Sequence, residues 1–166
     1  MRRLFFLLLV SLAIMGFYLG FGVLSGPDTV TVYFYRYEKL QPVRRTRQND
    51  LPKATVALTE LLAGPTTEER SNRIQTMLPP QLQCKSWSKA NDILILDFNQ
   101  ELLKISGGHN VIEGALKQIV FTATEIKGIK AVRFQVENQR GGTLVIGGEG
   151  YTIERPLGRD YFAGEY

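Results

Sequence analysis

Cysteine and histidine are almost absent from this 166-residue sequence, which contains only Cys84 and His109. A single cysteine excludes an intramolecular disulfide, so stability must come from packing, and such a thiol is more often a small buried hydrophobe than a reactive group. A single histidine excludes metal sites that need two. The sequence also lacks a G-x-S-x-G motif, a dinucleotide-binding loop and a P-loop. We therefore expect no metal, no cofactor and no enzymatic activity.

Charged residues are missing from residues 4–24, an apolar run that follows Arg2 and Arg3. Twenty-one helical residues would span about 31 Å, close to the thickness of a bilayer's hydrocarbon core. The run is longer than the apolar part of a cleavable signal, so we expect an uncleaved, single-pass transmembrane anchor. The two arginines favour a cytoplasmic N-terminus and an extracytoplasmic domain at the cell membrane.

The predicted organisation has three parts: residues 1–25 as cytoplasmic stub and anchor, 26–159 as one domain, and 160–166 as a C-terminal tail. A domain of this length can bury a single hydrophobic core. Cys84 lies deep within the domain and not just after the apolar run, so a lipid anchor is not expected.

Basic charge is concentrated in one stretch of the domain, where five bases stand against the single acid Glu38. These bases are the candidate polyanion-binding residues: Arg36, Lys39, Arg44, Arg45 and Arg47. Near an anionic membrane each could contribute up to about 1 kcal/mol, and an anionic wall polymer would feel the same field. No stacking-aromatic motif accompanies them, which argues against nucleic acid. The alternative interpretation is a solvated loop. Five bases so close to the anchor also argue against export, although long domains translocate largely regardless of charge.

Seven stretches have the alternating or β-branched composition of strands. They are residues 29–36, 40–43, 82–88, 93–98, 129–136, 143–146 and 151–154. Pro42 limits the second of these to a short or edge strand, and the basic tract after it is expected to be a hairpin return or an exposed loop. The continuous apolar run 93–98 predicts a strand that is covered on both faces or buried against helices. Residues 155–166 show no usable periodicity.

Two amphipathic helices are predicted from apolar residues at helical spacing. The first follows Asp50 and Pro52 and ends at Gly64. The second contains the stripe Ile112, Ala115, Leu116, Ile119, Val120 and Ala123. For it, Asn110 and Glu113 suggest a capping box and Gly128 a C-terminal stop. The order of elements predicts an α+β fold: a mixed or antiparallel β-sheet with both helices packed on one face, preceded by one transmembrane helix.

Several segments, taken in order, resemble the GerMN domain family, which is named for a spore germination protein. They are TELLAGPT at 59–66, Leu78-Pro79, LDFNQEL at 96–102, residues 113–125 continuing into GIKAVRF at 128–134, and IERPL at 153–157. The resemblance covers roughly residues 29–159. It implies an envelope domain of sporulating and other bacteria, similar in fold to ring-building modules of sporulation assembly proteins, with no established catalytic residues. The germination protein is a lipoprotein with two tandem copies, whereas this chain has a predicted peptide anchor and one copy.

Three functions follow as hypotheses. The first is a non-catalytic role in envelope assembly, sporulation or germination through contacts with envelope proteins or with further copies of the chain. The second is binding of wall polymer or anionic lipid through the basic tract. The third is a wall hydrolase that uses a carboxylate pair drawn from Asp97, Glu101 and Glu113, which would have to lie roughly 5–10 Å apart. His109 could serve as a general base, but a polar loop residue before a helix is the simpler interpretation. The glycine clusters at 141–142 and 147–150 are predicted to be turns.

Overall fold

The structure of the chain is a computed structural model that describes residues 28–47, 50–138, 142–148 and 150–163. Its strands are β1 (Thr29–Arg36), β2 (Lys39–Thr46), β3 (Ile74–Gln75), β4 (Cys84–Ala90), β5 (Ile93–Phe98), β6 (Ala131–Val136), β7 (Leu144–Ile146), β8 (Tyr151–Ile153) and β9 (Leu157–Gly158). Its helices are α2 (Lys53–Ala63), α3 (Thr67–Ser71) and α4 (His109–Thr124), with 3₁₀ turns η1 (Gln100–Leu102) and η2 (Arg159–Phe162).

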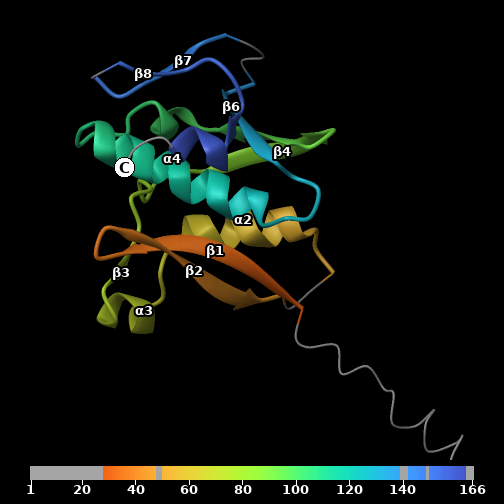
Figure 1. The fold of residues 1–166 in the computed structure, drawn as a ribbon, viewed down its shortest axis with the longest axis vertical. Helices are drawn as coiled ribbons and strands as arrows, with labels where there is room; N and C mark the ends of the chain where they lie inside the picture. Colours follow the sequence, from red (N-terminus) through yellow and green to blue (C-terminus); the bar gives the residue numbers. More distant parts are fainter. Residues whose placement is uncertain (1–27, 48–49, 139–141, 149, 164–166) are drawn as a thin grey trace, which may run out of the picture.

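The described strands form three sheets, with orders β2-β1-β3, β4-β5-β6-β9 and β7-β8. Helices α2 and α4 pack on each other and on β1, and α4 also packs on β6. The two helices thus lie between the two larger sheets (Figure 1). Strands β5 and β6 are parallel and joined through α4, whereas the other strand pairs are antiparallel.

The α+β class and the mixed strand directions are therefore confirmed, but the expected single sheet with both helices on one face is not what forms. The apolar stripe of each helix predicts that this face is buried against other elements. It does not determine whether one sheet or two sheets bury it. Here α4 is wide enough in its apolar face to contact both sheets: every residue of its predicted stripe is buried.

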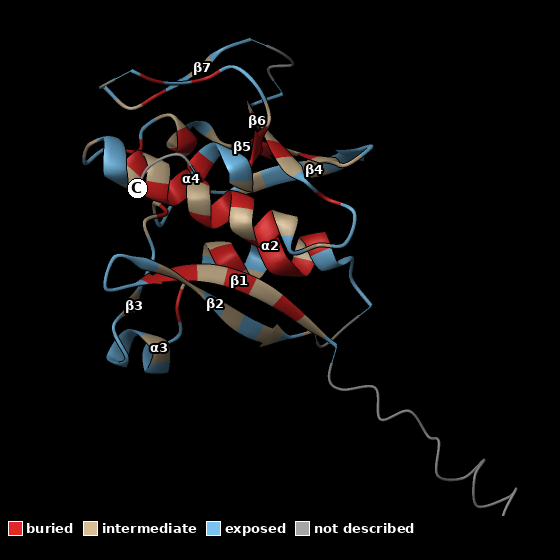
Figure 2. Cartoon of the chain, in the orientation of Figure 1, coloured by how far each residue is buried: buried red, intermediate tan, exposed pale blue. Residues whose placement is uncertain are grey.

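Strand β1 shows the alternation that the sequence predicted: Val30, Val32 and Phe34 are buried and belong to hydrophobic clusters that include residues of α2. Figure 2 shows buried and half-buried segments along β1. Strand β2 is longer than residues 40–43, because the basic tract forms the hairpin return, which was one of its two expected forms, and not an exposed loop. Pro42 lies opposite Tyr33, whose N–H and C=O bond to α4 instead. A proline without a backbone donor is tolerated at this edge position.

The second edge of β1 is satisfied by side chains of α4. The Tyr33 N–H donates to Thr122 Oγ1 at 3.0 Å, and Gln118 Nε2 donates to the Tyr33 carbonyl at 3.0 Å. Gln118 Oε1 in turn accepts the backbone N–H of Met77 at 2.7 Å. Both α4 side chains are fully buried. They close the gap in a sheet whose third strand, β3, pairs with only two residues of β1.

Helix termini differ from the sequence prediction. The capping box expected at Asn110 and Glu113 is absent: the N-cap of α4 is Gly108, two residues before Asn110, and no side chain caps the helix. Among the described helices the capping box instead opens the unpredicted helix α3, where Thr66 and Glu69 bond reciprocally. Gly64 ends α2 as predicted, with a φ of 78° that favours glycine.

The segment that lacked periodicity also joins the core. Leu157 and Gly158 form β9 on the edge of β6, and Phe162, which the sequence placed in the tail, is buried against the main core. The apolar run 4–24 lies outside the described residues, so the transmembrane anchor stays a prediction. Among the helices that the structure does describe, none combines the length and apolar character that a membrane span requires.

Candidate functional site

The β1–β2 hairpin carries the five bases that the sequence singled out, and strand geometry divides them between two faces. In the antiparallel register Arg45 lies opposite Val30 and Arg44 opposite Thr31. Because successive side chains of a strand point to opposite faces, the adjacent arginines cannot form one surface patch. Arg45 belongs to the face that packs on α2, and Arg44 belongs to the outer face.

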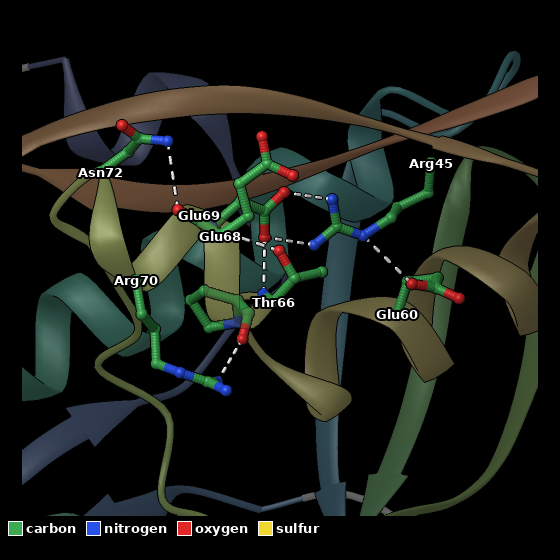
Figure 3. A network of polar contacts seen from close by, with 8 residues as sticks. Arg45, Glu60, Thr66, Glu68, Glu69, Arg70 and Asn72 are labelled. Carbon is green, nitrogen blue, oxygen red and sulfur yellow. Dashed lines mark hydrogen bonds and ion pairs between the residues drawn. The ribbon is translucent and has the colours of Figure 1, made fainter.

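Arg45 forms the centre of an ion cluster between β2, α2 and α3 (Figure 3). Its two terminal nitrogens donate to both carboxylate oxygens of Glu69, one of them at 2.6 Å, and its Nε donates to Glu60 at 3.1 Å. The guanidinium also lies 5.8 Å from the centroid of the Phe34 ring. The Arg45 side chain is only 13 % exposed. A bidentate arginine–carboxylate pair is among the stronger charged contacts, so this arginine is a structural tie and is not available to a ligand.

The protonation states support this assignment. The hydrogen bond from Arg45 is the main cause that lowers the pKa of Glu69, and the Thr66 cap acts in the same direction. The same bond raises the pKa of Arg45. The sequence could not identify this pair, because Glu60 and Glu69 lie 15 and 24 residues after Arg45. The capping-box pattern at Thr66 was the available signal that Glu69 would be held in place.

Arg47 is engaged as well. It pairs with Asp28 at 2.5 Å and donates to the Leu51 carbonyl at 2.7 Å, while Lys53 approaches the same Asp28 at 2.9 Å. The remaining bases, Arg36, Lys39 and Arg44, are exposed and form no ion pair with any described residue. Polyanion binding by the tract stays a prediction. Of its five bases, three are exposed and free of ion pairs with described residues, and these three could contact a ligand.

The carboxylates considered for wall hydrolysis lie in structural positions. Asp97 is 3 % exposed, and its Oδ1 accepts the backbone N–H of Asn138 at 2.9 Å. Its Oδ2 has no hydrogen-bond partner among the described residues. Glu101 lies in η1 and pairs with Lys104 at 2.8 Å. A carboxyl as buried as Asp97 cannot reach a polymeric substrate, although hydrolysis by a paired acid would require that contact.

His109, the first residue of α4, lies 3.6 Å from Glu113 and packs its ring on Tyr151 with 4.8 Å between centroids. His109 and Tyr151 border a hollow of about 310 Å³ that Tyr161 also lines. Thr152 is the hydroxyl-bearing residue besides the tyrosines in this lining, and its Oγ1 donates to the Gly150 carbonyl. Among the described residues, His109 therefore has no hydrogen-bonded serine, threonine or cysteine that could act as a nucleophile in this hollow. The described part of the chain also contains no cluster of three His, Cys, Asp or Glu residues that could hold a metal ion.

Cys84 is half-buried at the start of β4 and packs against the core. Burial, reinforced by the nearby Asp97 charge, raises the pKa of its thiol to about 11. A thiol with a raised pKa is a poor nucleophile at neutral pH, which agrees with the interpretation of Cys84 as a small hydrophobe.

Comparison with known proteins identifies the domain. Residues 31–142 match the family model described as "Germane: Sporulation and spore germination". No curated protein matches the chain. Three solved structures share the fold. The tandem GerMN domains of the sporulation protein GerM from Bacillus subtilis align with a TM-score of 0.60 at 23 % identity, covering 81 % of this chain and 45 % of that one.

The first GerMN domain of the same protein aligns alone with a TM-score of 0.58 at 20 % identity, covering 80 % of this chain and 98 % of that one. A putative lipoprotein from Clostridium perfringens aligns with a TM-score of 0.56 at 22 % identity, covering 82 % and 91 %. At these identities the structures show a shared fold, and this chain spans less than half of the tandem protein. Because the family model covers more than half of the sequence, the chain belongs to the Germane (GerMN) family of sporulation and spore-germination domains.

Proposed function

We propose that this chain is a non-catalytic assembly domain of the cell envelope, acting in sporulation or spore germination through protein contacts. Family membership and the fold shared with the GerMN domains of GerM support the process. The proposal assigns no cofactor and no reaction to the chain.

The observation that carries the non-catalytic assignment is the use of buried polar groups. Among the described residues three polar side chains are buried: Asp97, Gln118 and Thr122. Each bonds to backbone groups of a neighbouring strand or turn. Buried polar groups in an active site are usually aimed at one another or into a cleft where a substrate sits. Here Gln118 and Thr122 tie β1 and the segment after β3 to α4, and Asp97 fixes the turn after β6.

The proposal includes an anchor and an orientation. Residues 4–24 would hold the domain at the membrane, with Arg2 and Arg3 on the cytoplasmic side and residue 166 outside. A reporter fused after Tyr166 tests this part. Alkaline phosphatase activity without fluorescence of a fused green fluorescent protein is expected, and the opposite pattern would place the domain in the cytoplasm.

Deletion and complementation in the source organism test the proposed role. Loss of the chain is expected to lower the yield of heat-resistant spores or the fraction that germinates. The full chain should restore the yield, and the double variant Asp97→Asn, Glu101→Gln should restore it equally because no hydrolysis is involved. Unchanged sporulation and germination in the deletion strain would refute the role, and failure of the double variant despite normal protein levels would point to an enzyme.

Binding of wall polymer or anionic lipid through Arg36–Arg47 is not the function that the geometry favours. Arg45 and Arg47 are already paired with acids, and Arg44 faces away from them. A three-base remnant of the tract gives a weaker and more salt-sensitive attraction than the five bases of the sequence suggested.

A further inference from the structure

The tip of the β1–β2 hairpin has an unusual backbone. Its two-residue turn, Tyr37 and Glu38, has positive φ at both positions, 48° and 64°, as in a type I′ turn. Arg73, which precedes β3, has a φ of 63°. Such turns favour Asn-Gly, because a side chain with a Cβ is disfavoured in this region. Three residues with long side chains therefore hold left-handed conformations at one place, which is a known mark of functional sites.

The side chains at the tip carry charge that the protein does not neutralise. The guanidinium groups of Arg36 and Arg73 both lie 5.6 Å from the centroid of the Tyr37 ring, which is 62 % exposed. Neither arginine forms an ion pair within the described ranges. The ring attracts both cations and so holds two like charges near each other. With Lys39 the tip has three bases against the single acid Glu38.

A hollow of about 410 Å³ opens beside this ring, and we call it the tip hollow. Its lining consists of Tyr35, Tyr37, Glu38, Arg73, Gln75 and Met77. Tyrosine, arginine and methionine are the side chains enriched in the cores of protein–protein interfaces, and tyrosine and arginine dominate their hot spots. A polymer of phosphates would need an extended row of bases. The tip instead places one guanidinium, that of Arg73, in the lining of the hollow and a second, that of Arg36, against the same Tyr37 ring, next to the less polar side chains of Tyr35 and Met77.

We propose that the tip hollow is the docking site for an acidic segment of a partner protein. Carboxylates of the segment bind Arg36 and Arg73, and a neighbouring apolar side chain packs on Tyr37 and Met77. The positive charge of the tip favours an acidic partner. Glu38 repels any carboxylate of the segment that would lie next to it, and so restricts where the acidic residues of the segment can be. This inference rests on the proposed function, because it names the surface through which the protein contacts are made.

A peptide titration tests the docking site with the full chain in neutral detergent micelles. The probe is the acetylated, amidated peptide EELEE, with QQLQQ as the uncharged control, followed by NMR shifts of the Met77 methyl group. We expect EELEE to bind and QQLQQ to bind at least tenfold more weakly. The double variant Arg36→Ala, Arg73→Ala should weaken EELEE binding about tenfold, whereas Arg44→Ala on the outer face should stay within twofold.

Tyr37→Asn is the second variant, because asparagine tolerates the positive φ and the turn is preserved. It should weaken EELEE binding at least threefold while the melting temperature stays the same or rises. Equal binding of the two peptides, or unchanged binding in both the double variant and Tyr37→Asn, would overturn the proposal. Tighter binding of poly(glycerol phosphate) or phosphatidylglycerol vesicles than of EELEE, lost in the double variant, would also overturn it in favour of a phosphate ligand.

Photocrosslinking in sporulating cells separates this inference from the proposed function. A photoreactive amino acid replaces Tyr37 in one strain and Val145 in another, because Val145 is 52 % exposed on β7, away from the hairpin. We expect an adduct at position 37 that disappears when Arg36→Ala and Arg73→Ala are added. An adduct at position 145 alone would refute the docking site and leave the assembly role intact. Adducts at neither position would refute both.

Discussion

The two ends of the β1–β2 hairpin use arginine in opposite ways. At one end Arg45 lies over Phe34, is 13 % exposed, and binds the carboxylates of Glu60 and Glu69. At the other end Arg36 lies over the Tyr37 ring in solvent and has no acidic partner among the described residues. Both arginines lie at similar distances from an aromatic ring. They differ in that Arg45 is largely buried and paired with two carboxylates, whereas Arg36 is exposed and unpaired within the described ranges.

This difference shows why a count of bases is a poor guide to a binding surface. The sequence places five bases within twelve residues, yet the fold brings acids to two of them: Glu60 of α2 and Glu69 of α3 to Arg45, and Asp28, the residue before β1, to Arg47. A charge that is paired inside the protein stabilises the fold and no longer attracts a ligand. Only the unpaired end retains a field that a partner can use.

Of the substitutions that distinguish the two ends of the hairpin, removal of Arg45 should change the free energy of unfolding most. Arg45→Leu leaves Glu60 and Glu69 close together without their cation, and breaking a largely buried ion pair in this way costs about 3 kcal/mol. We expect the free energy of unfolding to fall by about that amount in urea titrations followed by the fluorescence of Trp87. Arg44→Leu, its neighbour on the outer face, is the matched control and should change stability by no more than about 0.5 kcal/mol. Equal effects of the two substitutions would mean that the cluster is not structural.

The second largest effect is expected at low pH, where the Arg45–Glu69 ion pair should lose its contribution to stability. The pKa of Glu69 is lowered in the folded protein, so its contribution to stability is present above the pKa of the unfolded chain and is lost as pH falls through the folded value. Glu69→Gln should reduce stability at pH 7 by about half the effect of Arg45→Leu, because one acid still pairs with Arg45. The gap between wild type and Glu69→Gln should then narrow below about pH 4 in urea titrations over a pH series. A gap that is constant with pH would contradict the ion pair.

The smallest effect is expected from a substitution in the hairpin turn at Tyr37 and Glu38, and it should raise the stability of the protein instead of lowering it. Glu38→Gly removes a side chain from a left-handed position, which should stabilise the hairpin by about 1 kcal/mol. Thermal unfolding should therefore shift upward by about 3 °C. Glu38→Ala is the control, because it removes the carboxylate but keeps the Cβ and should not give this gain. A loss of stability in Glu38→Gly would show that the turn is not strained.

Sequence patterns were sufficient for the elements with strong local signals. The alternation in β1, the apolar run of β5 and the stripe of α4 each predicted the element and its buried residues, because side-chain periodicity is a property of the local chain. Helix α3 and strand β9 were missed because they are short and take their stability from packing. The capping box was placed at the wrong helix because Asn110 and Thr66 both fit the pattern, and only the backbone geometry decides between them.

The candidate site was only partly predictable. The basic tract pointed to the correct hairpin, but the role of Arg45 depends on acids that are distant in sequence, and Arg73 reaches the tip from a different segment. The turn at Tyr37 and Glu38 contains neither glycine nor asparagine, so composition did not reveal its left-handed backbone. A charged side chain's function depends on its neighbours in space, and the sequence order of residues does not specify them.

By itself, the sequence determined that this protein has an α+β domain with two amphipathic helices, a GerMN signature and a concentration of positive charge near its first strand. The tertiary structure decided that the helices lie between two sheets, that Arg45 and Arg47 are neutralised, and that Arg36 and Arg73 meet around Tyr37. The physical reason is range. Periodicity and propensity act over a few residues, whereas ion pairing and the number of sheets depend on contacts between segments that only the folded chain brings together.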